Sequence, residues 1–590
     1  MSALPVVQPR DPWSPRPIDL PTPVPLDPEA DLELLDAAKI FAAPADPADW
    51  PAWREALTRW RVDAAARIGY DGAAYALPEY AWTRGCHSVA LVWLWDELLY
   101  DHVARRFTPD RFLTESEREF GGFDGIVLWH AYPVIGIDER NQFDYYRDVP
   151  GLRDLVEVLQ EHGVRVFVNY NPWDVGTRRE PVADDVAIAA LARELRVDGV
   201  FLDTMKEAQP GLRKALDEVR PGLALEGEST LPLERVCDHH LSWAQWFCDS
   251  EVPGVLRARW FEQRHMLHHT RRWNRDHAEE LHSAWLNGVG MLVWENVFGA
   301  WVGWNERDKA LLRAMLSVQR EHADLLATGE WTPLAASSPD TLVVASRWSD
   351  GETTLWAVAN RGEAYAGAVG ELEVEIPAMG IAAFVGSEQV LVAGGEEARF
   401  PARETVRVPA PIVRVETVPD GFVAVEPRAL TAVFRRRETG TYGEAPYVEE
   451  WKPLPPRLHD FVEVARPAPR GRFAISTRAV KTGLDLAEAR AYAASAGARL
   501  PTEDEWQLAA ESGLLDLSGP RAWDWTESEH TDGRTRFAIL KGGSDWPAEG
   551  SDWYVDGGPQ EPAYSLKLLL LGEGLSRSPW IGFRLAVDLE

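Results

Sequence analysis

The stretch that decides the fold runs from Gly122 to Asp174. It reads GFDGIVLWHAY (122–132), later GLRDLVEVLQEHG (151–163), and then VRVFVNYNPWD (164–174). The outer two segments contain continuous apolar runs that end in polar residues, which is typical of strands buried on both faces of a parallel sheet. The middle segment has apolar residues at helical spacing and ends at Gly163, a residue type that helices favour at their C-terminus. The stretch therefore predicts a β-α-β unit.

The same alternation continues on both sides of this unit. Eight such strands, separated by helices, favour a (β/α)8 TIM barrel over residues 81–325. A doubly wound sheet is the alternative, but the first turn lacks G-x-G-x-x-G and no P-loop is present. The other strand candidates are SVALVWLW (88–95), DGVFLDTM (198–205), LALEGEST (223–230), HLSWAQWF (240–247), the region around 257–263 and GVGMLVWENVFG (288–299).

The rest of the chain divides into three further parts. Residues 1–80 form a proline-rich arm and a helical segment. Residues 326–415 contain short alternating strands with Gly and Asn turns and no helix, which predicts an antiparallel β-sandwich. Residues 416–590 mix strands with a helix (485–497), which predicts an α+β domain. The expected fold class is thus a multidomain α/β protein.

Composition narrows the range of partners. The 590 residues carry a net charge of −32, and a surface of this sign repels nucleic acid and anionic membranes. The three cysteines give neither a disulfide framework nor a pair with metal-ligand spacing. No apolar run has the length of a signal peptide or a membrane span, so a cytoplasmic location is expected.

Tryptophan is unusually frequent, with 27 residues, many of them near acids or predicted strand ends. An indole face packs against the C–H face of a pyranose, while its N–H donates a hydrogen bond. The alternative is that these rings fill cores. Their density around the acids indicates a carbohydrate substrate.

Catalytic side chains of a barrel lie at the carboxyl ends of its strands. Asp203 follows the apolar run GVFL abruptly, and burying a carboxylate there requires a compensating reason. We expect Asp203 to be the catalytic nucleophile; the alternative is an Asp that caps the next helix.

The next strand offers Glu226 and Glu228, which have the same parity and so point to one face. Adjacent parallel strands lie about 4.8 Å apart, which suits the ~5–5.5 Å carboxyl gap of a retaining glycosidase. Glu228 is nearer the mouth and is the expected acid/base, with Glu226 raising its pKa as a like charge. Alternatively, one of the two is an ion-pair partner of an Arg deeper in the barrel.

The remaining polar residues at strand ends complete the expected site. His265, His268 and His269 are spaced like metal ligands, but the arginines around them oppose a divalent ion, so neither a metal nor another cofactor is expected. The alternative acids are Glu226, Asp249 and Glu295. The expected substrate-binding residues are Trp129, His130, Asn169, Asn171, Asp174 and Trp294.

The run from GFDGIVLWHAYPVIGIDERNQFDYY through VDGVFLDTM to LALEGES resembles barrel glycosidases of the melibiase (α-galactosidase-like) type. The resemblance implies that the strand-four Asp, here Asp203, is the nucleophile. It also implies that the antiparallel module is the sandwich that often follows such barrels. The melibiase pattern places the second acid on strand six, where Asp249 is the nearest match. The glutamates on strand five are an arrangement more like that of the α-amylase barrels.

A separate resemblance covers about 170 residues at the C-terminus. The segments ARLPTEDEWQLAAESG (498–513), RAWDWTES (521–528), LKGGSDW (540–546) and WIGFRLA (580–586) look like the formylglycine-generating (sulfatase-modifying factor) fold. Active members bind copper through a cysteine pair, but no Cys follows Cys248 here. The resemblance therefore implies a non-catalytic domain for sugar contact or for assembly, including homo-oligomer formation.

These features together predict a retaining glycoside hydrolase for a small glycoside or an oligosaccharide. One alternative is a non-catalytic carbohydrate-binding or scaffold protein, although two or three acids at adjacent strand ends would repel one another without a catalytic use. The other alternative is a transglycosylase with the same residues.

Overall fold

The structure of the chain is a computed structural model. The residues that it describes are 20–130, 134–174, 178–245, 248–270, 276–297, 300–340, 342–395, 401, 403–435, 461–469, 471–480, 482–547 and 554–590.

Eight parallel strands form a closed barrel in the order β10-β12-β13-β3-β6-β7-β8-β9, which confirms the predicted TIM barrel. The prediction of the seventh strand around 257–263 is wrong, because Arg257–Phe261 is the short helix α7. The barrel strands are β3 (Ser88–Trp93), β6 (Gly125–Trp129), β7 (Arg165–Tyr170), β8 (Gly199–Leu202), β9 (Ala224–Gly227), β10 (Leu241–Gln245), β12 (Met266–Thr270) and β13 (Gly290–Val293).

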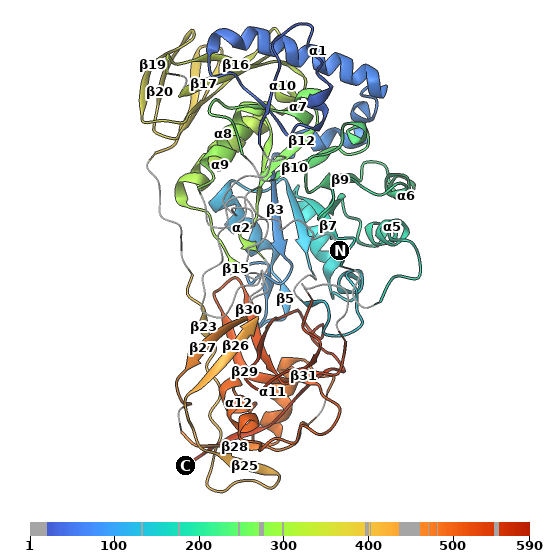
Figure 1. The fold of residues 1–590 in the computed structure, drawn as a ribbon, viewed down its shortest axis with the longest axis vertical. Coiled ribbons are helices and arrows are strands. Elements are labelled where there is room, and N and C mark those ends of the chain that lie inside the picture. Colours follow the sequence, from blue (N-terminus) through green and yellow to red (C-terminus); the bar gives the residue numbers. More distant parts are fainter. Residues whose placement is uncertain are drawn as a thin grey trace, which may run out of the picture.

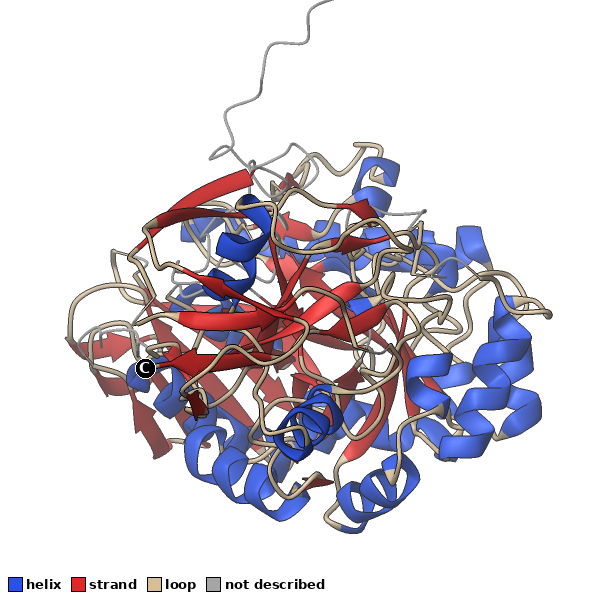
Figure 2. Cartoon of the chain, turned by 90° about the horizontal axis from the view of Figure 1, so that it is seen from below, coloured by secondary structure: helices blue, strands red, loops and turns tan. Residues whose placement is uncertain are grey.

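Helices pack on the outside of the barrel strands, and Figure 2 shows many helices along the lower and right-hand edges of the molecule in the view from below. The predicted helix that ends at Gly163 is α4, and Gly163 follows it with a φ of +82°. Gly121 and Gly288 also adopt positive φ, at the ends of α2 and α8. The surrounding helices are α2 (Pro109–Phe120), α4 (Leu152–Glu161), α5 (Asp184–Leu195), α6 (Leu212–Val219), α8 (Ala278–Asn287) and α9 (Glu306–Glu321).

The N-terminal segment packs onto the barrel through helix α1 (Trp50–Ile68). Trp53 and Trp60 of this helix are fully buried, and the Trp260 indole donates a hydrogen bond to the Leu57 carbonyl. A short strand, β2 (Ile40–Ala42), pairs with β11 (Val255–Leu256) of the barrel domain. None of the helices in the described part of the chain is both long enough and apolar enough to cross a membrane.

The module after the barrel is antiparallel, as predicted. A five-stranded sheet and a two-stranded sheet enclose a small core of their own that includes Val358, Val374 and Phe384. The other face of the larger sheet contacts the barrel, where the Trp285 indole of α8 donates to the Val358 carbonyl. The larger sheet contains β16 (Glu330–Ser337), β17 (Val343–Ser349), β18 (Thr354–Asn360), β21 (Ile381–Val385) and β22 (Glu388–Ala393), and the smaller contains β19 (Tyr365–Val369) and β20 (Leu372–Ile376).

The C-terminal module combines two larger antiparallel-rich sheets with helices α11 (Leu486–Ser495) and α12 (Glu503–Glu511), each begun by a capping box. Two strands before residue 416 already pair into these sheets, namely β23 (Val406–Arg407) and β24 (Arg414–Val415). The other main strands are β25 (Phe422–Val425), β26 (Leu430–Arg435), β27 (Phe461–Arg466), β28 (Phe473–Ser476), β29 (Trp523–Thr531), β30 (Arg536–Lys541), β33 (Ser565–Leu569), β34 (Ile581–Phe583) and β35 (Ala586–Leu589).

This C-terminal module lies against the carboxyl ends of the barrel strands, below the barrel in Figure 1. Its hydrogen bonds reach the loops after β3, β6, β7 and β13. The contacts include Arg534 with Asp96, Val555 N–H to the Ile135 carbonyl, Ser578 to the Ile137 carbonyl, Tyr554 to the Trp173 carbonyl, and Arg534 with Glu295. The buried apolar residues of the barrel and of this module form one continuous core. Catalytic chemistry at the barrel mouth would therefore take place beside the C-terminal module.

Candidate active site at the carboxyl end of the barrel

Asp203 directly follows β8 and is half-buried, and its N–H donates to the Tyr170 carbonyl of β7 at 2.9 Å. The next residue, Thr204, is exposed and has a φ of +62°. A β-branched residue seldom adopts this left-handed conformation, and such strain is concentrated at functional sites. The chain thus turns sharply at the position predicted for the nucleophile.

Glu228 follows β9 and is attached to this turn. One oxygen of its carboxylate accepts a hydrogen bond from the Thr204 N–H, and the Glu228 N–H donates to the Met205 carbonyl at 2.9 Å. Because Leu202 of β8 pairs with Gly227 of β9, the two predicted catalytic carboxylates follow paired positions of adjacent strands. The structure therefore brings Asp203 and Glu228 to the same edge of the barrel. The Glu228 carboxylate bonds the backbone N–H of Thr204, the residue directly after Asp203.

Gly227 allows this close approach. A Cβ at this position would lie 2.7 Å from the carbonyl oxygen of Lys206, which is backbone and cannot rotate away. Replacing Gly227 by Ala is expected to displace the turn after Asp203 and lower kcat/KM about tenfold or more, with a stability loss of about 1–3 kcal/mol. Initial rates and urea unfolding measure both effects.

The matched control is Gly85→Ala, because a Cβ there would meet only the Ala323 methyl at 4.0 Å. Equal kinetics for the two variants would show that the close approach at Gly227 does not position the predicted catalytic residues, Asp203 and Glu228.

Glu226 points into the barrel rather than toward the mouth. It is fully buried, and its Oε1 lies 2.5 Å from Nδ1 of His268, whose Nε2 donates to the Cys86 carbonyl at the amino end of β3. Burial lowers the pKa of His268, but the Glu226 carboxylate outweighs this effect, so the pKa of His268 is raised overall. These contacts favour the deeper ion-pair role for Glu226, with a histidine in place of the expected arginine.

This pair predicts a pH dependence of stability. A histidine whose pKa is higher in the folded chain stabilises fully below its unfolded pKa of about 6.5, and the stabilisation is lost as the pH rises through the folded value. Wild-type stability is therefore expected to fall above about pH 6.5. Glu226→Gln is expected to cost about 3–5 kcal/mol at pH 6 and to flatten that fall. Urea unfolding from pH 5.5 to 8.5 measures both, and an unchanged pH slope in the variant would contradict the pairing.

Asp249, the strand-six alternative, has a structural set of partners. Its side chain is 4% exposed, and one oxygen forms an ion pair with Arg361 of the antiparallel module at 2.9 Å. The other oxygen accepts from the N–H groups of Ser250 and Gly254. These contacts join two domains, and we do not assign Asp249 an acid role.

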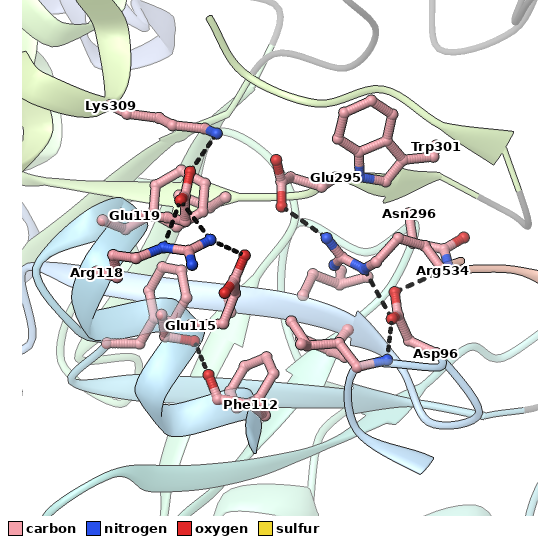
Figure 3. A pocket seen from close by; sticks show the side chains of 18 of the residues that line it. Asp96, Phe112, Glu115, Arg118, Glu119, Glu295, Asn296, Trp301, Lys309 and Arg534 are labelled. Carbon is pink, nitrogen blue, oxygen red and sulfur yellow. Dashed lines mark hydrogen bonds and ion pairs between the residues drawn. The ribbon is translucent and has the colours of Figure 1, made fainter. Parts of the chain in front are cut away.

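Glu295 follows β13 and faces the C-terminal module. Its Oε2 pairs with Nη1 of Arg534 at 3.2 Å, and Nε of the same Arg534 lies 2.8 Å from Asp96, which follows β3 (Figure 3). These two acids raise the pKa of the Arg534 guanidinium despite its burial, so it stays charged. The cluster borders a cavity of about 210 Å³ on the flank of the barrel, against α2 and α9. Glu295 is thus part of an interdomain ion-pair cluster.

His130 and Asn171 hold a loop after β6 by hydrogen bonds to Gln142, and Asn169 is in the neighbouring strand β7. Gln142 of that loop accepts from Asn171 N–H at 3.0 Å, and its own amide donates to the Asn171 carbonyl at 2.6 Å. His130 Nε2 bonds the Gln142 carbonyl at 2.6 Å, and burial lowers the pKa of His130 to about 3, so the ring is neutral. The Asn169 Oδ1 is buried and has no hydrogen-bond partner among the described residues, which leaves it able to accept from a ligand.

Asp174 is also buried, and this burial raises the pKa of its carboxyl group well above the usual range. Burial thus favours the protonated form of this carboxyl group. Trp129 and Trp294 are at most 4% exposed, and Trp129 packs on Trp93 with a centroid distance of 5.3 Å. The structure thus places both predicted sugar-contacting rings in the core beneath the mouth.

Sequence reasoning missed several residues that build this site. Thr204 and Gly227 set the backbone, and Tyr146 accepts from the Asn169 N–H at 2.7 Å while its ring stacks on His130 at 3.6 Å. No sequence pattern marks the strained Thr204, since β-branched residues disfavour positive φ. Tyr132 and Trp246, which lie near the ends of the strand segments 122–132 and 240–247, are outside the described residues.

His265, His268 and His269, which are spaced like metal ligands, lie in β12 or directly before it. The structure puts His268 in the ion pair with Glu226, and the His265 ring bonds Tyr75 and Ser242 at 2.8 Å each. Across the residues that the structure describes, no group of three or more His, Cys, Asp or Glu side chains is arranged to hold a metal ion.

Comparisons with known proteins give distant likenesses in fold. No model of a protein family matches the chain, and no curated protein sequence does. A cyclic α-maltosyl-(1→6)-maltose hydrolase from Arthrobacter globiformis is 11% identical, covers 51% of this chain and 99% of its own, and has a TM-score of 0.34. A maltogenic α-amylase from Thermotoga neapolitana is 12% identical over 51% and 88%, at 0.33. An Anoxybacillus α-amylase is 10% identical over 54% and 99%, at 0.35.

Proposed function

We propose that this chain is a retaining glycoside hydrolase that acts on small glycosides or short oligosaccharides. The observation that carries the proposal is the hydrogen bond from Thr204 N–H to the Glu228 carboxylate, which ties the acid after β9 to the residue that follows Asp203. Adjacent strand ends, about 4.8 Å apart, suit the ~5–5.5 Å separation of a retaining carboxylate pair.

In the proposed mechanism, a carboxylate oxygen of Asp203 attacks the anomeric carbon. The bond from that carbon to the leaving oxygen breaks as Glu228 gives its proton to this oxygen. Glu228 then takes a proton from water, the water oxygen bonds to the anomeric carbon, and Asp203 leaves as a carboxylate. Asn169 would accept a hydrogen bond from a sugar hydroxyl group through its buried Oδ1, and Asp174 would bind a second hydroxyl group.

The position of the second acid bears on the subtype. Glu228 on strand five supports an arrangement like that of the α-amylase barrels, because Asp249 on strand six is joined to Arg361. The nucleophile on strand four is common to both arrangements. For the C-terminal module, we propose a formylglycine-generating-enzyme-like fold without redox chemistry, since the chain has no cysteine beyond Cys248.

A panel of 4-nitrophenyl glycosides tests the proposal. It contains both anomers of glucose, galactose, mannose and xylose, together with the α-maltoside, and product configuration is followed by NMR. We expect turnover of at least one member with retention of configuration. Inversion would contradict the mechanism, and the absence of turnover would favour the carbohydrate-binding alternative. Disaccharide products at high substrate concentration would identify transglycosylation.

A further inference from the structure

Trp173 differs from the other tryptophans near the barrel mouth. Trp173 is 69% exposed, whereas Trp93, Trp129 and Trp243 are at most 2% exposed. An indole has a large apolar face whose burial is favourable, so leaving it in water has a cost unless another molecule covers it. An exposed Trp beside a candidate active site is therefore a feature to explain.

The backbone around this exposed ring is held on both sides. The Trp173 N–H donates to Oδ1 of Asn171 at 2.9 Å, and the Trp173 carbonyl accepts from the hydroxyl of Tyr554 at 2.9 Å. Tyr554 belongs to the C-terminal module and is itself buried. The backbone of Trp173 is thus held by hydrogen bonds from the barrel and from the C-terminal module.

Trp173 lies at the edge of the candidate active site. Tyr170, the last residue of β7, pairs with Leu202, the residue before Asp203. Trp173 comes three residues after Tyr170, in the loop that follows this strand end. On the other side of Asp203, Thr204 and Lys206 are exposed, so solvent reaches this part of the mouth. Asp174, the next residue along the chain after Trp173, is buried.

We propose that Trp173 is a stacking platform for a pyranose ring of the substrate and that Tyr554 is its positioning residue. This inference rests on the proposed glycosidase function and names its substrate contact. An indole face covers the C–H face of a sugar by apolar contact. The C-terminal module then forms part of the substrate-binding site instead of an independent appendage.

Binding is measured in the Asp203→Asn background, so that it does not depend on turnover. The probes are maltose, melibiose, cellobiose and lactose, followed by saturation-transfer NMR and titration calorimetry. Trp173→Ala is expected to weaken binding of the best probe about tenfold, while Trp173→Phe recovers most of it. The control is Trp82→Ala, because Trp82 lies at the opposite end of the barrel against Arg165, the first residue of β7.

Tyr554→Phe tests the positioning role. Losing the hydrogen bond to the Trp173 carbonyl is expected to raise KM about threefold in the active enzyme with kcat unchanged. A fall in kcat with constant KM would contradict it.

The outcomes separate this inference from the proposed function. If a glycoside turns over and Trp173→Ala leaves both probe binding and KM unchanged, the stacking role of Trp173 is wrong and the proposed hydrolase function is kept. If probes bind through Trp173 and no glycoside turns over, the stacking role of Trp173 is supported and the proposed hydrolase function is wrong. If none of the four probes binds to the Asp203→Asn chain, the platform is overturned.

Discussion

Replacing Asp203 by Asn is expected to lower kcat/KM for the best aryl glycoside by at least about a thousandfold, while leaving the fold intact. The amide keeps the size of the carboxylate but cannot form the glycosyl ester. Since the Asp203 N–H, not its side chain, bonds the Tyr170 carbonyl, the backbone turn is retained. Initial rates together with thermal unfolding measure the two effects.

The matched controls are the acids assigned here to structural contacts. Asp249→Asn removes the charge that pairs with Arg361, and Glu295→Gln removes the one that pairs with Arg534. Both are expected to lower stability, with kcat per folded molecule within about threefold of wild type. A thousandfold loss in either control, with Asp203→Asn active, would move the nucleophile to that residue.

Replacing Glu228 by Gln is expected to have the second largest effect, and the size should depend on the leaving group. Hydrolysis of glycosides with poor leaving groups should fall about 10²–10⁴-fold, because the departing oxygen is no longer protonated. Formation of the glycosyl-enzyme from a 2,4-dinitrophenyl glycoside should fall little, since that leaving group departs unprotonated. The Gln oxygen still accepts from the Thr204 N–H, so the turn is preserved.

Steady-state rates across a series of leaving groups and a pre-steady-state burst measure this difference. We expect a steep dependence of the rate on leaving-group pKa in Glu228→Gln and a shallow one in wild type. An equal loss of rate for all leaving groups would show that Glu228 binds or positions the substrate and does not transfer a proton.

Much of the barrel could be predicted from the sequence because most of its strands are continuous apolar runs. The seventh strand was missed for a physical reason. Met266–Thr270 carries His268 and His269 in its middle, and both are buried in the fold, so the strand lacks the apolar signal. The polar pairing of His268 with Glu226 becomes visible only when strands 42 residues apart in the sequence are neighbours in space.

The sequence predicts which polar residues lie at strand ends, but it does not predict which of their side chains are buried in the barrel and which reach its mouth. Parity places Glu226 and Glu228 on one face, yet only the structure shows that the first turns inward to His268 while the second meets the Thr204 N–H. Likewise, Trp129 and Trp173 both follow apolar runs, but one is in the core and the other is exposed. The contact of Arg534 with Asp96 spans 438 residues and carries no local sequence signal.

The most direct test of the central claim is to trap the glycosyl-enzyme. Wild type is treated with an activated fluorosugar of the configuration that turns over, digested, and analysed by mass spectrometry of the peptides. We expect a single sugar-mass increase on the peptide that contains Asp203, absent in Asp203→Asn and still formed in Asp249→Asn. A label on a peptide whose only modified carboxylate is Glu228, Asp249 or Glu295 would contradict the account.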